Sequence, residues 1–384
     1  MSTAVFTFVL FSAALSAADF PIGFTKAPPP DGKTPAGAGA YQELVRLGYV
    51  FHRLGGKGVT EAEIDHSMDR SAAEGMHVAL YLPQVTGPAN AAAEAELRRL
   101  VMKYRNHPAL TYWKGDDEPE WGKVPVERVA RFYQIVKELD PKHPVWLAQA
   151  PRGTVESLKR YDPYYDIGGM DIYPIGYPPG THSVLPNKNI SMVGDHADIV
   201  RAYMAPGKPF FMTLQIAWSG VTKPGKTLRF PTFPEERYMS YQSIIHGARG
   251  LIYFGGNLPE TLNDRDRPLG WNWTFYERVL KPVLDEFNPA GPLYPALIAQ
   301  DSKLPVHVAG DGIEFCVREA AGHVFVIAAK REGDTIQAKF TGLPSDLGEG
   351  KLLFEEPRKV TAAGGAFTDW FGPNEVHVYR FDRR

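Results

Sequence analysis

The sequence predicts an α/β fold, a (β/α)8 (TIM) barrel followed by a small all-β sandwich domain. Apolar runs with strand character alternate with helical patterns over about 270 residues, close to the usual size of such a barrel. After Pro305 the pattern changes to short, often alternating runs divided by Gly, Asp and Pro, which predicts antiparallel strands. A doubly wound open sheet is the competing architecture. It is disfavoured because no glycine-rich phosphate loop follows the first strand.

The elements of the barrel follow from hydrophobic periodicity and from stop signals. The predicted strands are residues 20–25, 49–53, 77–82, 109–113, 145–148, 166–173, 209–216 and 250–254. The helices include 40–47, 126–139, 155–161, 193–204 and 273–287, together with one that ends before Asn106. Two further helices open with a capping box, Thr60 with Glu63 and Thr232 with Glu235.

The chain divides into three parts. Residues 1–18 have an apolar core and small residues before Asp19, which predicts a signal peptide and a secreted or periplasmic protein. This leader has no Lys or Arg, and it is too short to span a membrane stably. Residues 19–300 are the predicted catalytic barrel and residues 301–384 the predicted sandwich. No later segment resembles a transmembrane helix, so we expect no stable membrane insertion.

Composition narrows the classes of partner and cofactor. The net charge of -2 gives no reason to expect a nucleic-acid partner. Cys316 is the single cysteine, so no disulfide framework or thiolate metal cluster is expected. The histidines lack zinc-like spacing, and no metal or organic cofactor is implied. Aromatic residues make up 12% of the chain, which suits a site that stacks on the flat faces of sugar rings.

The carboxylates that carry chemistry are expected after the fourth and sixth strands. The stretch 106–121 (NHPALTYWKGDDEPEW) places Asp116, Asp117 and Glu118 at the carboxyl end of a buried strand, where barrel active sites lie. Asp171 ends the sixth strand in the same way. Structural roles compete with this interpretation: Asp116 or Asp117 capping the next helix, and Asp171 bonding a loop or Arg53.

A ring of other polar and aromatic side chains is predicted at the same end of the barrel. The predicted substrate-binding residues are His52, Arg53, Asp116, Tyr173, Gln215, Trp218 and Tyr253.

Three stretches carry a resemblance to a known clan. Residues 106–121 resemble the fourth-strand segment of the (β/α)8 retaining glycosidases, where the strand ends in Asn-Glu-Pro. Residues 232–254 and 367–381 resemble the seventh-helix, eighth-strand and C-terminal segments of the β-galactosidase-like branch. The resemblance implies that Glu118 is the acid/base. Two departures stand out: Asp117 replaces the Asn, and Gln215 stands where the nucleophile Glu is expected.

We therefore expect a glycoside hydrolase that cleaves an O-glycosidic bond in an oligo- or polysaccharide. Glu118 would be the general acid, and Asp171 or Asp117 the second carboxylate. If Asp171 faces Glu118 across the barrel, the gap would be the wide one of an inverting enzyme, about 6.5–9.5 Å. The alternative is a carbohydrate-binding protein with little or no hydrolysis, which Gln215 favours. A lyase with Asp171 or Glu118 as base is a third possibility. The sequence leaves the oligomeric state open.

Overall fold

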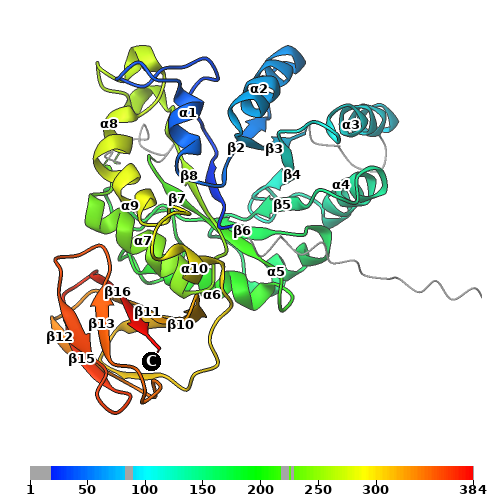
Figure 1. The fold of residues 1–384 in the computed structure, drawn as a ribbon. Coiled ribbons are helices and arrows are strands. Elements are labelled where there is room, and N and C mark those ends of the chain that lie inside the picture. The colour runs from blue at the N-terminus through cyan, green and yellow to red at the C-terminus, as the bar shows by residue number, and fades with distance from the viewer. Residues whose placement is uncertain (1–18, 83–89, 218–224, 226–228, 384) are drawn as a thin grey trace, which may run out of the picture.

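The computed structural model describes residues 19–82, 90–217, 225 and 229–383 (Figure 1). The predicted leader 1–18 and Trp218 lie outside the described residues.

Eight parallel strands form the barrel, which confirms the predicted fold. They are β1 (Ile22–Phe24), β2 (Val50–Gly55), β3 (His77–Tyr81), β4 (Leu110–Asp117), β5 (Val145–Ala148), β6 (Gly168–Asp171), β7 (Phe210–Gln215) and β8 (Leu251–Phe254). Their order in the sheet is β5-β4-β3-β2-β1-β8-β7-β6. Parallel bridges from Trp146 to Ile167 and from Gln149 to Met170 join β5 to β6 and close the barrel.

Helices surround the barrel, as Figure 1 shows. They are α1 (Ala40–Val45), α2 (Glu61–Glu74), α3 (Ala91–Tyr104), α4 (Val126–Leu139), α5 (Val155–Lys159), α6 (Met192–Tyr203) and α7 (Phe233–Ile245). Both predicted capping boxes are present, at Thr60 and at Thr232. Within the described ranges, no helix is long and apolar enough to cross a membrane.

The structure differs from the predicted elements in three places. The fourth strand extends to Asp117 instead of ending at Trp113, so two of the acids belong to the strand itself. The helix predicted over 273–287 is split into α8 (Trp273–Phe275), a π-helical turn η5 (Tyr276–Leu280) and α9 (Lys281–Asp285). Pro282 lies at the second break, and proline removes a helical hydrogen-bond donor. A short helix that was not predicted, α10 (Tyr294–Ile298), lies before the C-terminal domain.

The barrel interior is filled by aromatic and aliphatic side chains. Phe51 contacts Tyr112 edge-to-face at 5.0 Å between ring centroids. Trp146 and Phe211 lie 6.1 and 6.0 Å from the same Phe51 ring. These packed side chains fill the barrel interior below the carboxyl ends of the strands, as in other barrels of this type.

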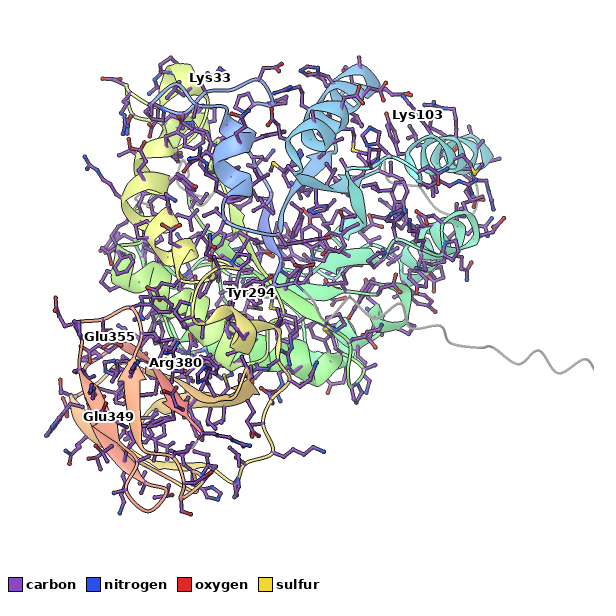
Figure 2. All side chains as sticks on the ribbon, in the orientation of Figure 1. Lys33, Lys103, Tyr294, Glu349, Glu355 and Arg380 are labelled. Atoms are coloured by element: carbon purple, nitrogen blue, oxygen red, sulfur yellow. The ribbon has the colours of Figure 1, made fainter. Side chains whose placement is uncertain are left out.

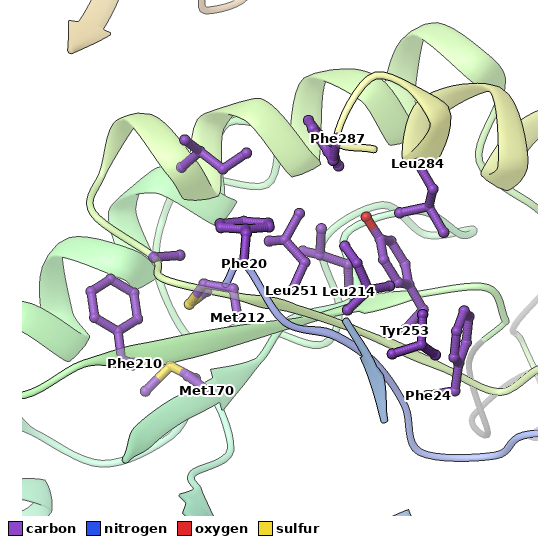
Figure 3. Close-up of a cluster of buried hydrophobic side chains, with 14 of the residues drawn as sticks. Phe20, Phe24, Met170, Phe210, Met212, Leu214, Leu251, Tyr253, Leu284 and Phe287 are labelled. Carbon is purple, nitrogen blue, oxygen red and sulfur yellow. The ribbon is translucent and has the colours of Figure 1, made fainter. Parts of the chain in front are cut away.

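A second, larger core lies between the strands and the helices. Figure 3 shows part of it, with Phe20, Met212, Leu251, Leu284 and Phe287 on the outer side of the strands. Most of these side chains are fully buried.

The C-terminal domain is a two-sheet sandwich. One sheet has the order β10-β11-β16-β13-β14 and the other β15-β12-β9. The strands are β9 (His307–Ala309), β10 (Ile313–Ala320), β11 (His323–Lys330), β12 (Ile336–Thr341), β13 (Glu349–Leu352), β14 (Lys359–Thr361), β15 (Phe367–Phe371) and β16 (Val376–Asp382).

The sandwich packs on helix α7 of the barrel. Strand β11 is buried on both faces: Val324, Val326 and Ala328 face the sandwich core, and Phe325 and Ile327 face the barrel core. Figure 2 shows the side chains of the whole molecule, with Glu349, Glu355 and Arg380 marking the sandwich. Helix α7 is therefore enclosed between the two domains, which explains why nearly all of its residues are buried.

Candidate functional site

A pocket of about 250 Å³ opens at the carboxyl ends of the barrel strands. Its walls combine carboxylates, cations and aromatic rings. The lining residues are Thr25, Arg53, Asp117, Glu118, Trp121, Trp146, Ala148, Ala150, Pro151, Arg152, Asp171, Tyr173, Thr181, His182, Thr213 and Phe254.

The end of β4 directs two consecutive acids into this pocket. In an extended strand, successive side chains point to opposite faces. Asp116 accordingly points away and forms an ion pair with Arg128 at 2.9 Å, while Asp117 lines the pocket. Glu118 would point away again, but its backbone has a φ of 49°, in the left-handed region that is rare for a non-glycine residue. This turn allows Asp117 and Glu118 to line the same pocket.

Asp117 is held as a carboxylate by two cations. Lys114 Nζ lies 3.0 Å from Asp117 Oδ1, and Arg53 Nη1 donates to Oδ2 at 2.8 Å. Burial alone would raise the pKa of Asp117, but the charges of Lys114 and Arg53 outweigh it and lower the pKa to about 2. The Lys114 side chain is fully buried, and its ammonium also donates to the carbonyls of Gly115 and Asp116.

Glu118 and Asp171 are neighbouring carboxyl groups of the pocket, and each has a raised pKa. Burial and the charge of Asp117 raise the pKa of Glu118. Burial and the charge of Glu118 raise the pKa of Asp171 well above its ordinary value. Within the part of the chain that the structure describes, Asp171 Oδ1 receives no hydrogen bond from any N–H or O–H group. Burial and the neighbouring negative charges thus favour the protonated form of Asp171.

Asp171 and Glu118 line the same pocket. The charge of Glu118 raises the pKa of Asp171, so the two side chains are close neighbours. The width of the gap between the two carboxyl groups stays a prediction.

Three stacked rings form one wall of the pocket. The Tyr173 ring lies between Phe254, at 5.1 Å, and His182, at 4.4 Å. His182 Nδ1 accepts a hydrogen bond from the Tyr173 backbone N–H at 3.1 Å, so a neutral His182 carries its proton on Nε2. That Nε2 lies 3.6 Å from Asp171 Oδ2.

Gln215 lies outside the pocket lining, and both polar atoms of its side-chain amide bond the backbone of Ile175. Its Oε1 accepts from the Ile175 N–H at 2.8 Å, and its Nε2 donates to the Ile175 carbonyl at 2.9 Å. The side chain is buried and ties the segment after β6 to the end of β7. A glutamate could not make the second bond, because a carboxylate has no donor.

Three other predicted binding residues also lie away from the pocket. His52 is buried and bonds Ser71 of α2 at 2.9 Å. The hydroxyl of Tyr253 bonds Ser240 of α7 at 2.9 Å. Asp116 faces α4 through Arg128. Of the predicted residues, the structure brings together Arg53, Asp117, Glu118, Asp171 and Tyr173.

Sequence reasoning missed several residues that line or support the site. Lys114 carries a recognisable signal, because a lysine inside a buried apolar strand needs a partner. Arg152 and His182 lie in loops and carry no such signal. Trp121 was not missed: its closeness in sequence to Glu118 predicts an aromatic ring near the site, and it lines the pocket with 60% of its surface exposed. Within the described residues, no group of three or more His, Cys, Asp or Glu could hold a metal ion.

Comparisons with known proteins support the fold. No protein-family model and no curated protein matches this sequence. Among solved structures, the alpha-amylase from Geobacillus thermoleovorans in complex with acarbose is 12% identical, with a TM-score of 0.61 over 96% of this chain and 99% of that one. A family 5 glycoside hydrolase from Bacteroides vulgatus is 13% identical, with a TM-score of 0.60 over 95% and 90%.

A family 39 glycoside hydrolase from Bacteroides cellulosilyticus is 15% identical, with a TM-score of 0.55 over 96% of this chain and 81% of that one. These similarities span both domains. This chain therefore has the fold of (β/α)8 glycoside hydrolases with a C-terminal β-domain.

Proposed function

We propose that this protein is a glycoside hydrolase that cleaves an O-glycosidic bond in an oligo- or polysaccharide. The observation that carries the proposal is the Glu118–Asp171 pair, two carboxyl groups with raised pKa values in one pocket with aromatic walls. Glycoside cleavage needs one protonated carboxyl group for the leaving oxygen and one carboxylate that attacks the sugar or activates water. The pair supplies one of each. The glycoside hydrolases with the same fold support this assignment.

The division of roles follows from the surroundings of the two carboxyl groups. Glu118 is half-buried at the pocket wall, whereas Asp171 is almost fully buried. In the free enzyme the proton resides on Asp171. Substrate entry places the glycosidic oxygen beside Glu118, which takes the proton and delivers it. Asp171, left as a carboxylate, then acts on the anomeric carbon or on water.

Trp121 is the proposed sugar platform. Its exposed indole lines the pocket, and an apolar ring face in such a position suits a sugar ring. Arg53 and Tyr173 complete the proposed substrate contacts, and Asp117 is the alternative second carboxylate.

The test compares two kinds of substrate with Glu118→Gln and Asp171→Asn. Natural oligosaccharides need protonation of the leaving group, whereas aryl glycosides with acidic phenol leaving groups do not. We expect both variants to lose oligosaccharide cleavage by about 10²- to 10⁴-fold. Glu118→Gln should retain much of its activity on the aryl glycosides, and Asp171→Asn should not.

The control is Glu138→Gln, the same change at an exposed position on α4, which should leave the kinetics unchanged. If Glu118→Gln keeps full activity on oligosaccharides, the assignment of Glu118 as the general acid is wrong. If Asp117→Asn loses activity on both kinds of substrate while Asp171→Asn stays active, Asp117 is the second catalytic carboxylate instead of Asp171.

A carbohydrate-binding protein is the second candidate function. Gln215 favours it, because the end of β7 carries an amide that is fully used by Ile175. Sugar binding without cleavage of any compound in a broad oligosaccharide panel would select this candidate.

We further propose that the protein is secreted or periplasmic, with residues 1–18 as a cleaved leader. The apolar run before Asp19 supports this proposal. N-terminal sequencing of the protein made in an exporting host should start at Asp19. An intact Met1 in the mature protein would contradict it.

A further inference from the structure

Arg152 contributes a cation to the pocket that the reaction proposed above does not use. It lies in the loop between β5 and α5, close to the carboxyl pair, and its charge lowers the pKa of Glu118 slightly against the larger effect of burial. The guanidinium is fixed in place by one nitrogen: Nη1 donates to the Pro151 carbonyl at 3.1 Å and to the His182 carbonyl. These two bonds join the loops that follow β5 and β6.

Within the described part of the chain, the rest of the guanidinium has no hydrogen-bond partner. Among the residues described, Nε and Nη2 of Arg152 have no hydrogen-bond acceptor, and neither atom is a fully enclosed, unsatisfied group. No carboxylate of the described chain lies within ion-pair distance of Arg152. The other arginine of the pocket, Arg53, is by contrast already paired with Asp117 at 2.8 Å.

The local charge balance leaves Arg152 uncompensated. Asp117 is matched by Lys114 and Arg53, which both contact it. Arg152 lines the same pocket and has no ion pair with any described carboxylate. A cation left unmatched in this way attracts an anion and repels a cationic sugar.

We propose that Arg152 selects an acidic sugar, with the carboxylate of a uronic acid bound at the free edge of its guanidinium beside the cleaved bond. This inference rests on the proposed glycoside hydrolase function and names its substrate class. A guanidinium presents two parallel N–H groups that match the two oxygens of a carboxylate, and Nε with Nη2 forms such a pair of donors. Because Nη1 is fixed by two carbonyls, the free edge is oriented before the substrate arrives.

The experiment measures binding and turnover of matched sugars by the full chain. Homogalacturonan, alginate and glucuronan oligosaccharides form the acidic arm, and their neutral counterparts of the same length form the other. Sulfated oligosaccharides form a third arm, since a sulfate ester offers an anion of another origin. Calorimetry gives the dissociation constants and does not depend on turnover.

We expect at least one acidic oligosaccharide to bind more tightly than its neutral counterpart and to lose affinity as salt increases. Arg152→Gln should lower the affinity for that acidic oligosaccharide by about 10- to 100-fold and leave the affinity for the neutral one unchanged. Arg152→Lys should recover part of the loss, because a lysine keeps the charge but not the paired donors. Lys159→Gln, which removes an exposed charge on the nearby helix α5, is the matched control.

Equal affinity for acidic and neutral sugars would overturn the proposal. The proposal would also be overturned if Arg152→Gln lowered the affinity for acidic and neutral oligosaccharides equally, since this would mean that Arg152 only joins the two loops. A preference for the sulfated arm alone would overturn the uronic acid assignment. If acidic sugars bind through Arg152 but none is cleaved, the hydrolase function fails and the role of Arg152 stands.

Discussion

Glu118 occupies a backbone conformation that costs stability and serves the site. A non-glycine residue in the left-handed region is destabilised by about 1–2 kcal/mol, and Glu118 has a φ of 49°. The turn is what brings Asp117 and Glu118 into one pocket. The strain is therefore located at the residue to which we assign the proton transfer.

The strain predicts an unusual order of stability for two inactive variants. Glu118→Gly and Glu118→Ala both lack the carboxyl group, so they differ mainly in backbone freedom. Glycine adopts a positive φ without a Cβ clash, and we expect Glu118→Gly to be more stable than Glu118→Ala by about 1 kcal/mol. Urea unfolding of both variants measures the difference. The opposite order, which is the rule in helices and strands, would show that position 118 is not left-handed.

The carboxyl pair also predicts a pH dependence of stability. Burial and the charge of Glu118 raise the pKa of Asp171 in the folded state, whereas it titrates near about 4 in the unfolded chain. Between these two values the folded protein binds more protons than the unfolded protein, so stability falls as pH rises. Asp171→Asn removes this titrating group. We therefore expect the free energy of unfolding of the variant, relative to that of the wild type, to increase from pH 4 to pH 8.

Chemical unfolding at several pH values tests this slope. Asp117 does not interfere, because it is present in both proteins and its own titration cancels in the difference between them. A constant difference between wild type and variant would contradict the raised pKa of Asp171.

Gln215 predicts that restoring a carboxylate at the end of β7 does not create a nucleophile. Gln215→Glu loses the donor to the Ile175 carbonyl and buries a charge. We expect a loss of about 1–3 kcal/mol of stability and no gain in hydrolysis. Thermal unfolding and the oligosaccharide assay measure the two effects. A several-fold gain in turnover would instead mean that Gln215 replaces a catalytic residue.

At the level of elements, the first turn of helix α7 is held by its N-terminal capping box. Thr232 Oγ1 accepts from the Glu235 N–H, and the Glu235 carboxylate accepts from the Thr232 N–H at 2.8 Å. Thr232→Ala should lower the free energy of unfolding by about 1 kcal/mol. Thr361→Ala, at the exposed end of β14, is the control and should change stability little. Equal effects of the two changes would argue against the cap.

At the level of the whole molecule, the sandwich is part of the barrel's hydrophobic core. Phe325 and Ile327 of β11 belong to the same buried cluster as the barrel helices. Arg237 of α7 donates to the Val376 carbonyl of β16 at 2.8 Å, and Arg331 forms an ion pair with Asp195 of α6 at 2.9 Å. The two domains thus share apolar and polar contacts.

We therefore expect the barrel alone to be unstable. A chain of residues 19–300 would expose the apolar face that β11 covers, and it should aggregate where residues 19–384 remain soluble. Soluble expression and size-exclusion chromatography of the two chains test this expectation. A monomeric barrel with a cooperative unfolding transition would show that the sandwich is an independent appendage.

The sequence by itself determined the order of the elements and the end of the barrel at which the site lies. Alternation of strand and helix patterns sets a parallel sheet, and the carboxyl ends of its strands meet on one side, so Asp117, Glu118 and Asp171 had to be neighbours. Local patterns were sufficient because each depends on residues a few positions apart.

Only the tertiary structure decided which side chains face the pocket. The choice depends on the direction of each strand end and on partners far along the chain. His52 and Tyr253 point to the helix layer, Gln215 is used by Ile175, and a left-handed backbone at Glu118 reverses the expected alternation. Arg152 and His182 reach the site from loops whose paths no short-range pattern encodes, because they are fixed by contacts between segments that are distant in the sequence.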